Sequence, residues 1–462
     1  MELFGFRLPE DFLIGTANSA FQSEGAWDRD GKSESVMDYY AREFAGKEVA
    51  NQSAFVERSR YSEELPDRGC YFYDNYEAYI EDMQKTGQNT FRLALAWTRI
   101  IPTGFGEVNQ KGIDFYNKVI DKFLTCGITL LVDLLHWDLP QCLMELGGYE
   151  NPDFPKWFEA YAKVCFEAFG DRVKMWSTFN ENAIAVTNGY FYGSFPPFRK
   201  DTRLGLLAAH HTILAHFRAV RAYRATNQGG KIGAVNCITD TTPAEPCEED
   251  IGAVARQQEF TFGWWVQPML EGTYPQRVLR ECPVIRENMP ENYQQDLDAW
   301  FAPMDYIGLN YYISQRTEYN PDTLLLSNRV ESFYSTPGQS YASYPAGLFD
   351  VVQYIGDRYH NIEMYITENG CAMPNSGDEE KDCEDDARIT YIREHLRSCA
   401  RLIRAGYNLK GYYYWNDADS YEELDGYKLR FGLTWVDSKT GRRRWKKSRY
   451  YFSKICKSRL IN

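Results

Sequence analysis

The sequence lacks the features that mark a membrane protein, a nucleic-acid binder or a disulfide-stapled domain. No apolar run approaches the roughly 18 residues of a membrane span. Lys and Arg number 51 against 65 Asp and Glu, and a net charge of −14 disfavours nucleic acid and anionic membrane as partners. The 11 cysteines are scattered singly without a C-x-x-C pair, which favours reduced thiols in the cytoplasm over a disulfide framework.

Signals for targeting and for cofactors are also missing. The first residues, MELFGFRLPEDF, contain no basic segment, apolar segment or small-residue cleavage site, so we expect no secretory signal and a cytoplasmic location. No glycine-rich phosphate cradle is present, and no nucleotide cofactor is expected. His210, His211 and His216 do not share one helix face, which predicts a packing helix and no metal site.

Two charged runs have a plain interpretation. The acidic run 378–386 lacks the spacing and the glycine of an EF-hand, and we expect a solvated loop there. The basic run 442–447 is predicted to be a solvated approach to the last helix, in preference to a phosphate-binding patch.

Aromatic residues are what the sequence has in excess. They make up 16% of the 462 residues, with 34 Tyr and 11 Trp. Flat aromatic faces suit the C–H faces of sugar rings, but a large barrel also uses aromatic side chains as core filler. Composition alone leaves both interpretations open.

Short β-branched and aromatic runs alternate along the chain with longer segments of helical periodicity. Several runs, such as LALAW and TLLVDLL, are apolar on both faces, as in strands buried on both sides of a parallel sheet. Helices are expected over 73–86, 111–125 and 386–405, and a Pro-started helix is expected to end at Gly170. The predicted strands span 12–17, 90–97, 129–136, 174–180, 231–238, 306–312, 364–367 and 409–415.

Eight strands alternating with helices predict a fold of the α/β class, a (β/α)8 TIM barrel, in preference to an open doubly wound sheet. No Gly/Ser-rich or Pro-rich linker divides residues 1–462, so one domain is expected. Long loops near 30–70, 240–260, 313–345 and 371–385 are expected over the C-terminal face of the barrel, where the active sites of such folds lie.

Polar side chains gather at these predicted strand ends. Glu181 closes the fourth strand and Glu368 closes the seventh, nearly opposite each other around the barrel. Hydrolysis of a glycosidic bond needs such a pair, because one carboxylic acid protonates the leaving oxygen while one carboxylate attacks or activates water. Two unrelated surface glutamates are the plain alternative. Other polar or aromatic side chains at or near the predicted strands disfavour that alternative. They are Gln22, Arg92, His136, Trp137, Asn180, Asn310, Tyr312 and Trp415.

Six segments resemble glycoside hydrolase family 1, the β-glucosidase family, in that family's order and over nearly the whole chain. They are SAFQSEG at 19–25, FRLALAW at 91–97, LHWDLP at 135–140, TFNE at 178–181, IGLNYY at 307–312 and ITENG at 366–370. The resemblance implies a retaining β-glycosidase that needs no cofactor or metal and acts on a small β-glycoside or oligosaccharide. It leaves open whether the chain forms a homo-oligomer.

The resemblance also implies roles for individual residues. Glu368 would be the nucleophile, with Tyr312 and Arg92 beside it lowering its pKa, and Asn310 would support catalysis. Glu181 would be the acid/base, with a raised pKa that falls once the covalent intermediate removes the neighbouring charge. Asn180 would hold the sugar 2-hydroxyl, and Trp415 would be the stacking floor. The remaining positions implied to bind substrate are Gln22, His136, Trp137, Glu422 and Phe431.

The chain departs from the family pattern at two places. Glu423 stands where the family's glucosidases usually have Trp, so an acceptor replaces an N–H donor. Tyr341 stands where the family often has a Trp lining the leaving-group site, which changes the expected leaving-group preference.

These departures keep several alternatives open. A 6-phospho-β-glycosidase is one alternative, although the acidic loop 417–425 would repel a phosphate dianion. The same acidic loop suggests a sugar that carries an amine, as in a glucosaminidase-like enzyme. A catalytically silent carbohydrate-binding barrel is an alternative of another class, and transglycosylation would use the same residues as hydrolysis.

Overall fold

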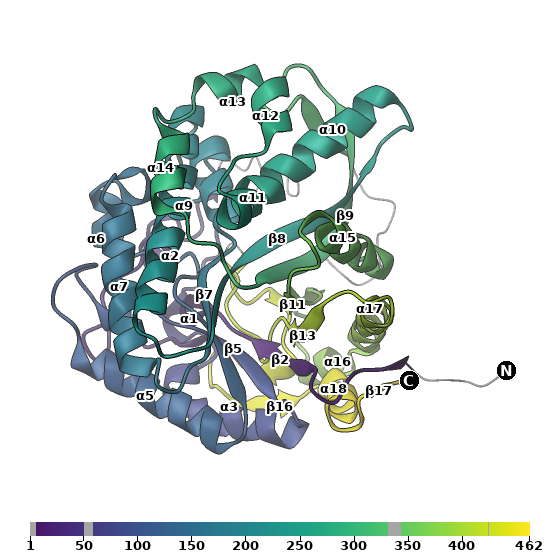
Figure 1. The fold of residues 1–462 in the computed structure, drawn as a ribbon. Coiled ribbons are helices and arrows are strands. Elements are labelled where there is room, and N and C mark those ends of the chain that lie inside the picture. The colour runs from purple at the N-terminus through teal and green to yellow at the C-terminus, as the bar shows by residue number, and fades with distance from the viewer. Residues whose placement is uncertain (1–5, 50–58, 331–342, 424) are drawn as a thin grey trace.

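A closed ring of parallel strands forms the centre of the computed structural model, which describes residues 6–49, 59–330, 343–423 and 425–462. Helices surround the ring (Figure 1), so the predicted (β/α)8 barrel is confirmed. The ring closes where the fifth strand in sequence pairs in parallel with the sixth. In spatial order it contains β9 (Ile307–Tyr319), β11 (Met364–Asn369), β13 (Leu409–Tyr414), β2 (Leu13–Ala17), β5 (Thr90–Ala94), β6 (Thr129–Asp133), β7 (Met175–Asn180) and β8 (Lys231–Pro243).

The ring strands are buried on both faces, as their apolar sequences predict. Every residue of β5 and of β11 is buried. At Gly15 of β2 a side chain would collide with the neighbouring strand, because a Cβ there would lie 1.8 Å from the carbonyl oxygen of Thr90. Glycine at this position therefore lets two strands of the ring approach closely.

The four predicted helices are present as α3 (Phe72–Thr86), α5 (Gln110–Thr125), α7 (Phe154–Phe169) and α17 (Asp386–Arg404). Each buries an apolar stripe against the barrel and turns its charged face outward. Gly87 ends α3 in the left-handed conformation (φ 85°), as its place after the periodic segment predicts.

Several predicted strand boundaries are wrong, and the strand expected over 129–136 already stops at Asp133. The strand expected over 90–97 stops at Ala94, and Trp97 instead begins the short helix α4 (Trp97–Ile100). Strands β8 and β9 continue beyond the barrel to Pro243 and Tyr319, into regions expected to be loops. The β-branched run TDTTP favours this extension. The strand β10 (Ser327–Val330) pairs antiparallel with the extended part of β9, and the helix α10 (Glu248–Gln258) follows the extended part of β8 in the chain.

The histidine-rich segment is the packing helix α9 (Thr202–Ala225) that the sequence predicts. His210 lies against Tyr274 and Asp296, whereas His211 bonds the Tyr149 carbonyl. Among the described residues no group of three or more His, Cys, Asp or Glu could hold a metal ion.

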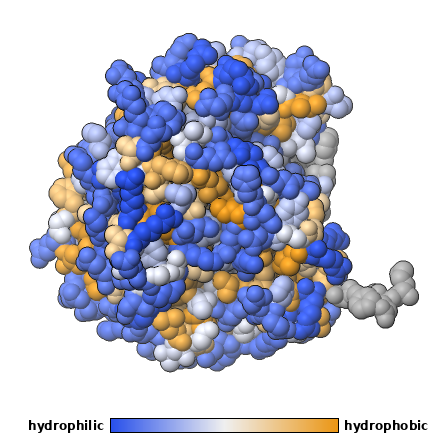
Figure 2. Space-filling model, viewed as in Figure 1, coloured by the Kyte–Doolittle hydropathy of each residue, from blue (hydrophilic) through white to orange (hydrophobic). Residues whose placement is uncertain are grey.

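The outer surface is strongly polar on the side shown in Figure 2, where hydrophilic residues predominate and apolar ones form separate patches. Within the described ranges, no helix combines the length and apolar character needed to cross a bilayer. All 11 cysteines lie in those ranges and are free thiols.

Candidate active site

The carboxylate of Glu368, at the end of β11, is held through both of its oxygens. Arg92 Nη1 donates to Oε1 at 2.9 Å, and the Tyr312 hydroxyl donates to Oε2 at 2.6 Å. Arg92 comes from β5 and Tyr312 from β9, so three strands of the ring converge on one carboxylate. Such charge-assisted bonds fix its orientation and favour its ionised form.

Arg92 is fully buried and is bound on every side. Its Nε donates to Asp133 Oδ2 at 2.5 Å, and Nη1 also donates to the Thr367 carbonyl at 2.8 Å. Nη2 donates to Asn180 Oδ1 at 2.8 Å. Sequence reasoning missed Asp133, although a carboxylate inside the apolar run TLLVDLL already signals a buried ion pair.

Glu181 follows β7 in the left-handed conformation, with φ 49° and ψ 48°. Its backbone N–H donates to the Val235 carbonyl at 2.9 Å, which ties this turn to the neighbouring strand β8. Asn310 and the thiol of Cys237 act to lower the pKa of Glu181, against the larger effect of burial. The sequence offered no signal for Cys237, because an isolated Cys inside a strand is ordinary core.

The two carboxyls differ in the charges that face them. Burial and the charge of Glu368 raise the pKa of Glu181 to about 8. Burial also raises the pKa of Glu368, which Arg92 and Tyr312 pull back down. Arg92 and Tyr312 thus lower the pKa of Glu368 as expected, but burial outweighs them and the net shift is upward. Of the pair, Glu181 is the carboxyl that keeps a proton near neutral pH.

Amide side chains link the two carboxyls. Asn180 Oδ1 accepts from Arg92 and also from Asn310 Nδ2 at 3.0 Å, and Thr367 donates to Asn310 Oδ1 at 2.8 Å. His136 Nε2 lies 2.9 Å from Asn180 Nδ2. Burial and the charge of Arg92 hold the pKa of His136 well below its usual value, so this ring is neutral.

Aromatic rings line the site beside these polar groups. Trp415, at the end of β13, stacks on His136 with ring centroids 5.7 Å apart. Phe431 packs edge-on against Tyr312 at 6.3 Å, in one cluster with Trp415. Trp137 meets Phe195 edge-on at 5.6 Å and has a left-handed backbone (φ 70°).

Gln22 and the loop after β13 form a second polar wall. Gln22 lies on α1 (Ala20–Ser23), and its Nε2 donates to the Tyr421 carbonyl at 2.9 Å and to Glu422 Oε2 at 3.1 Å. Burial and the charges of Glu368 and Asp425 raise the pKa of Glu423 to about 7. Of the predicted site residues, Tyr341 alone lies outside the part of the chain that the structure describes.

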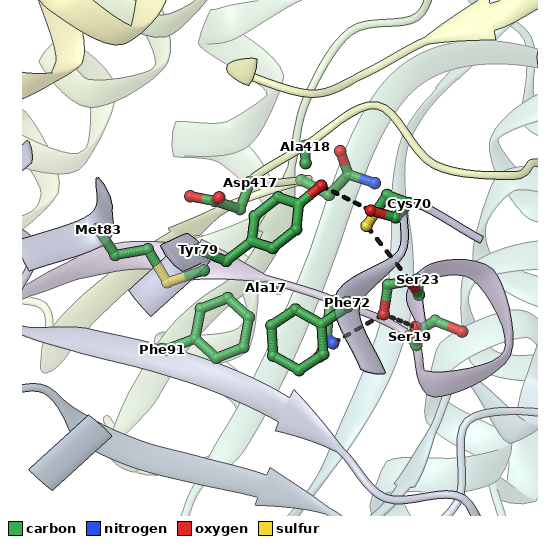
Figure 3. Close-up of a pocket in the computed structure, with 12 residues that line it drawn as sticks. Ala17, Ser19, Ser23, Cys70, Phe72, Tyr79, Met83, Phe91, Asp417 and Ala418 are labelled. Carbon is green, nitrogen blue, oxygen red and sulfur yellow. Dashed lines mark hydrogen bonds between the residues drawn. The ribbon is translucent and has the colours of Figure 1, made fainter. Parts of the chain in front are cut away.

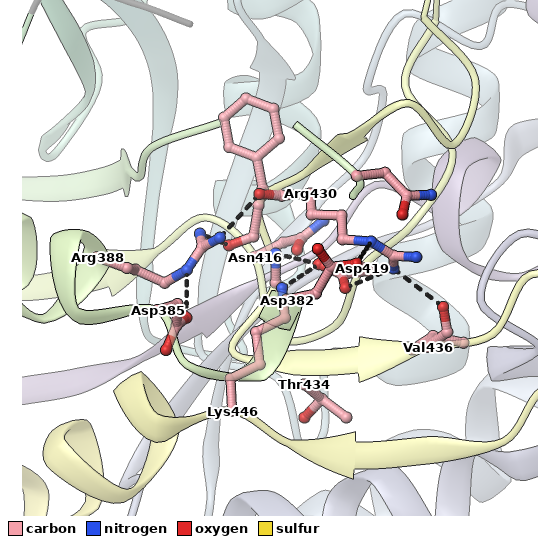
Figure 4. Close-up of polar contacts among 12 residues, drawn as sticks. Asp382, Asp385, Arg388, Asn416, Asp419, Arg430, Thr434, Val436 and Lys446 are labelled. Atoms are coloured by element: carbon pink, nitrogen blue, oxygen red, sulfur yellow. Dashed lines mark hydrogen bonds and ion pairs between the residues drawn. The ribbon is translucent and has the colours of Figure 1, made fainter. Parts of the chain in front are cut away.

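Buried ion pairs anchor the loop that carries Glu422, as Figure 4 shows. Asp419 accepts from Lys446 Nζ at 2.6 Å and from Arg430 Nη1 at 2.9 Å. Arg430 also pairs with Asp382 at 3.0 Å. The segments 378–386 and 442–447 are therefore not simply solvated, because each places a charged side chain in this network. The first segment forms the short helix α16 (Glu379–Cys383), and the second contains the strand β16 (Arg443–Trp445).

A small cavity lies behind α1 and is lined by residues of β2, α3 and the loop after β13 (Figure 3). Its volume is about 20 Å³, which is enough for one water molecule. The Cys70 thiol and the Tyr79 hydroxyl beside it bond backbone carbonyls, at 3.4 Å and 2.6 Å. Neither catalytic candidate lines this cavity.

Known proteins resemble this chain along its whole length. Residues 6–460 match the model of glycosyl hydrolase family 1. "Beta-glucosidase A" of Thermotoga maritima is 35% identical over 453 residues, 98% of each chain. "6-phospho-beta-glucosidase GmuD" of Bacillus subtilis is 34% identical over 97% of each chain. The solved structure of the Thermotoga maritima β-glucosidase with glucoimidazole superposes with a TM-score of 0.90, at 35% identity, over 98% of this chain and 100% of that one.

Proposed function

Because the chain belongs to glycosyl hydrolase family 1, we propose that it hydrolyses terminal β-glycosides with net retention, using Glu368 as nucleophile and Glu181 as acid/base. The observation that carries this proposal is the unequal setting of two buried carboxyls. Arg92 and Tyr312 bind Glu368, whereas Glu181 has no cation bonded to it among the described residues. A nucleophile needs the first setting, and a proton donor needs the second.

The first step forms a covalent ester. One oxygen of Glu368 attacks the anomeric carbon while the bond to the leaving oxygen breaks, and Glu181 gives its proton to that oxygen. The negative charge of Glu368 is lost in the ester, so the pKa of Glu181 falls and its carboxylate becomes a base. Arg92 and Tyr312 orient the carboxylate for this attack.

The second step releases the sugar. Glu181 takes a proton from water, whose oxygen attacks the anomeric carbon, and the bond to Glu368 breaks. The sugar leaves with its original β configuration, and both carboxyls return to their starting states. If an alcohol replaces water the same step is transglycosylation, and product analysis with added alcohol measures that share.

We propose that the substrate is a β-glucoside without a phosphate group, in preference to a 6-phospho-β-glucoside. The 6-phospho-β-glucosidase relative makes phosphate the competing candidate. In this chain the guanidinium of Arg430 is engaged by Asp419 and Asp382, which leaves it poorly placed to bind a phosphate dianion. Glu422 and Glu423 would also repel that dianion.

Asn180, beside both Arg92 and Glu181, is proposed to hold the sugar 2-hydroxyl, with Trp415 as the stacking face. Gln22, His136 and Glu422 are proposed to bind the other hydroxyls. Trp137, Phe431 and Glu423 complete the proposed substrate wall. The contacts of Gln22 with Glu422 and of His136 with Asn180 support one continuous polar surface.

We also propose a cytoplasmic location for the protein. The free state of the 11 cysteines supports a reducing compartment. A homo-oligomer is compatible with the proposal, because no role above requires a second chain.

The test is a panel of 4-nitrophenyl β-glycosides with wild type and Glu368→Ala. The panel contains the glucoside, galactoside, fucoside, glucuronide and 6-phosphoglucoside. We expect turnover of a neutral sugar that the substitution abolishes. Turnover of the phosphoglycoside alone would overturn the proposed substrate, and no turnover of any member would favour a silent carbohydrate-binding barrel.

A further inference from the structure

The wall formed by Gln22, Glu422 and Glu423 presents hydrogen-bond acceptors and has its donors already engaged. The amide N–H groups of Gln22, which is 2% exposed, go to the Tyr421 carbonyl and to Glu422. Gln22 Oε1 accepts no hydrogen bond from the residues that the structure describes. Oε1 of Glu422 is buried and likewise has no partner in that part of the chain.

No basic side chain of the described ranges pairs with the carboxyl groups of this wall. Over the described ranges, neither Glu422 nor Glu423 forms an ion pair. The basic groups anchored beneath the loop, Arg430 and Lys446, are bound to Asp419 instead. Arg430 and Lys446 thus stabilise the base of the loop and pair with neither Glu422 nor Glu423.

The two carboxylates also repel each other and Glu368. Burial raises the pKa of Glu422 most, and the charges of Glu423, Asp425 and Glu368 raise it further. Buried like charges of this kind are costly unless a cation or a proton joins them. The unpaired Gln22 oxygen beside them is a second, uncharged acceptor that a donor-rich group would satisfy.

The ring order places this wall away from the anomeric carbon. Glu181 after β7 and Glu368 on β11 fix that carbon between them in the proposed reaction. Gln22 follows β2 and Glu422 follows β13, on the far side of β11 in the ring. A sugar that reaches this wall therefore does so with the carbons remote from its reacting end.

We propose that the site prefers a β-glycoside whose glycone carries an ammonium group on carbon 3, 4 or 6, held by Glu422, Glu423 and Gln22. This inference rests on the proposed function, and it adds a cationic glycone as a better substrate than the neutral glucoside of that proposal. An ammonium group offers three hydrogen-bond donors and a positive charge. A hydroxyl offers one donor and carries no charge. An amine on carbon 2 would instead lie beside Arg92 and Asn180, where the guanidinium opposes it.

The experiment compares kcat/KM for 4-nitrophenyl β-glucoside with its 2-, 3-, 4- and 6-amino-deoxy analogues, at a pH that protonates the amines. We expect at least one of the 3-, 4- and 6-amino analogues to exceed the glucoside by about tenfold, the low end for close charge pairs. The 2-amino analogue carries the same charge and is the positional control, expected to be poorer than the glucoside.

Variants then assign the preference to the wall. Glu423→Gln should remove most of the advantage of the amino sugar while the glucoside changes less. Glu167→Gln removes one charge from an exposed position of α7 and should keep the advantage. An equal loss with both substrates in Glu423→Gln would overturn the charge role.

The wild-type panel alone can refute the inference, so it does not depend on how a variant folds. If the glucoside is hydrolysed and every amino analogue is poorer, the ammonium site is refuted and the proposed function stands. If no aryl glycoside is hydrolysed, the proposed function itself fails.

Discussion

The Tyr312 hydroxyl lies 2.6 Å from Oε2 of Glu368, while the other oxygen of that carboxylate is bound by Arg92 at 2.9 Å. The two donors come from different strands and leave the carboxylate little freedom to rotate. Burial opposes ionisation of Glu368, so the ionised nucleophile depends on these two contacts.

Tyr312→Phe should therefore weaken catalysis and shift its pH dependence. A hydrogen bond to a charged group contributes about 1.5–3 kcal/mol, so kcat/KM should fall about 10- to 100-fold. Without the phenol the pKa of Glu368 rises further, and the acid limb of the pH–rate profile moves to higher pH. Tyr319→Phe, at an exposed position of the same strand, is the control. An unmoved acid limb would contradict this role for Tyr312.

Glu181 should set the alkaline limb of the profile. The first step needs Glu181 protonated, and its pKa is about 8, so kcat/KM should be full below that value and fall as the pH rises through it. In Glu181→Gln the alkaline limb should disappear, and substrates with poor leaving groups should lose about 10²–10⁴-fold in rate. Activated leaving groups need little protonation and should lose much less. Equal losses for both substrate types would argue that Glu181 is not the acid.

Lys446 should stabilise the fold through the network under the substrate loop. Its ammonium is fully buried on Asp419, and removal of one partner of a buried pair costs about 3–5 kcal/mol. Lys446→Met should lie at the low end of that range, because Arg430 still binds Asp419. Urea unfolding measures the difference.

The neighbouring Lys447 supplies a matched control. It is half exposed and pairs with Glu384 and Asp386 at the surface, so Lys447→Met should change stability by no more than about 0.5 kcal/mol. Similar effects from the two substitutions would contradict the buried role of Lys446.

The barrel and the carboxyl pair were predictable from sequence because both depend on local signals. Continuous apolar runs indicated strands buried on both sides, and Glu181 and Glu368 stood at strand ends. Boundaries failed where a run keeps its β character beyond the barrel, as in β8, which continues to Pro243. Nothing in that run marks where the ring ends, since only the neighbouring strands decide this.

Contacts between distant segments were not predictable. Lys446 and Asp382 both belong to charged runs that resemble solvated segments, yet the fold brings each of them against the loop after β13. The balance at Glu368 was also missed, because burial is a property of the whole site and not of the nearby motif. The domain count and the role of Tyr341 stay predictions.

The most direct test of the central claim is to trap the covalent intermediate. The wild type is incubated with the 2-deoxy-2-fluoro analogue of its best glycone, activated by a good leaving group, and the protein is digested for peptide mass spectrometry. The account predicts a mass gain of one fluorosugar on the peptide that contains Glu368, and no gain in Glu368→Ala. A stable adduct on another residue, or inactivation without any adduct, would contradict retention through Glu368.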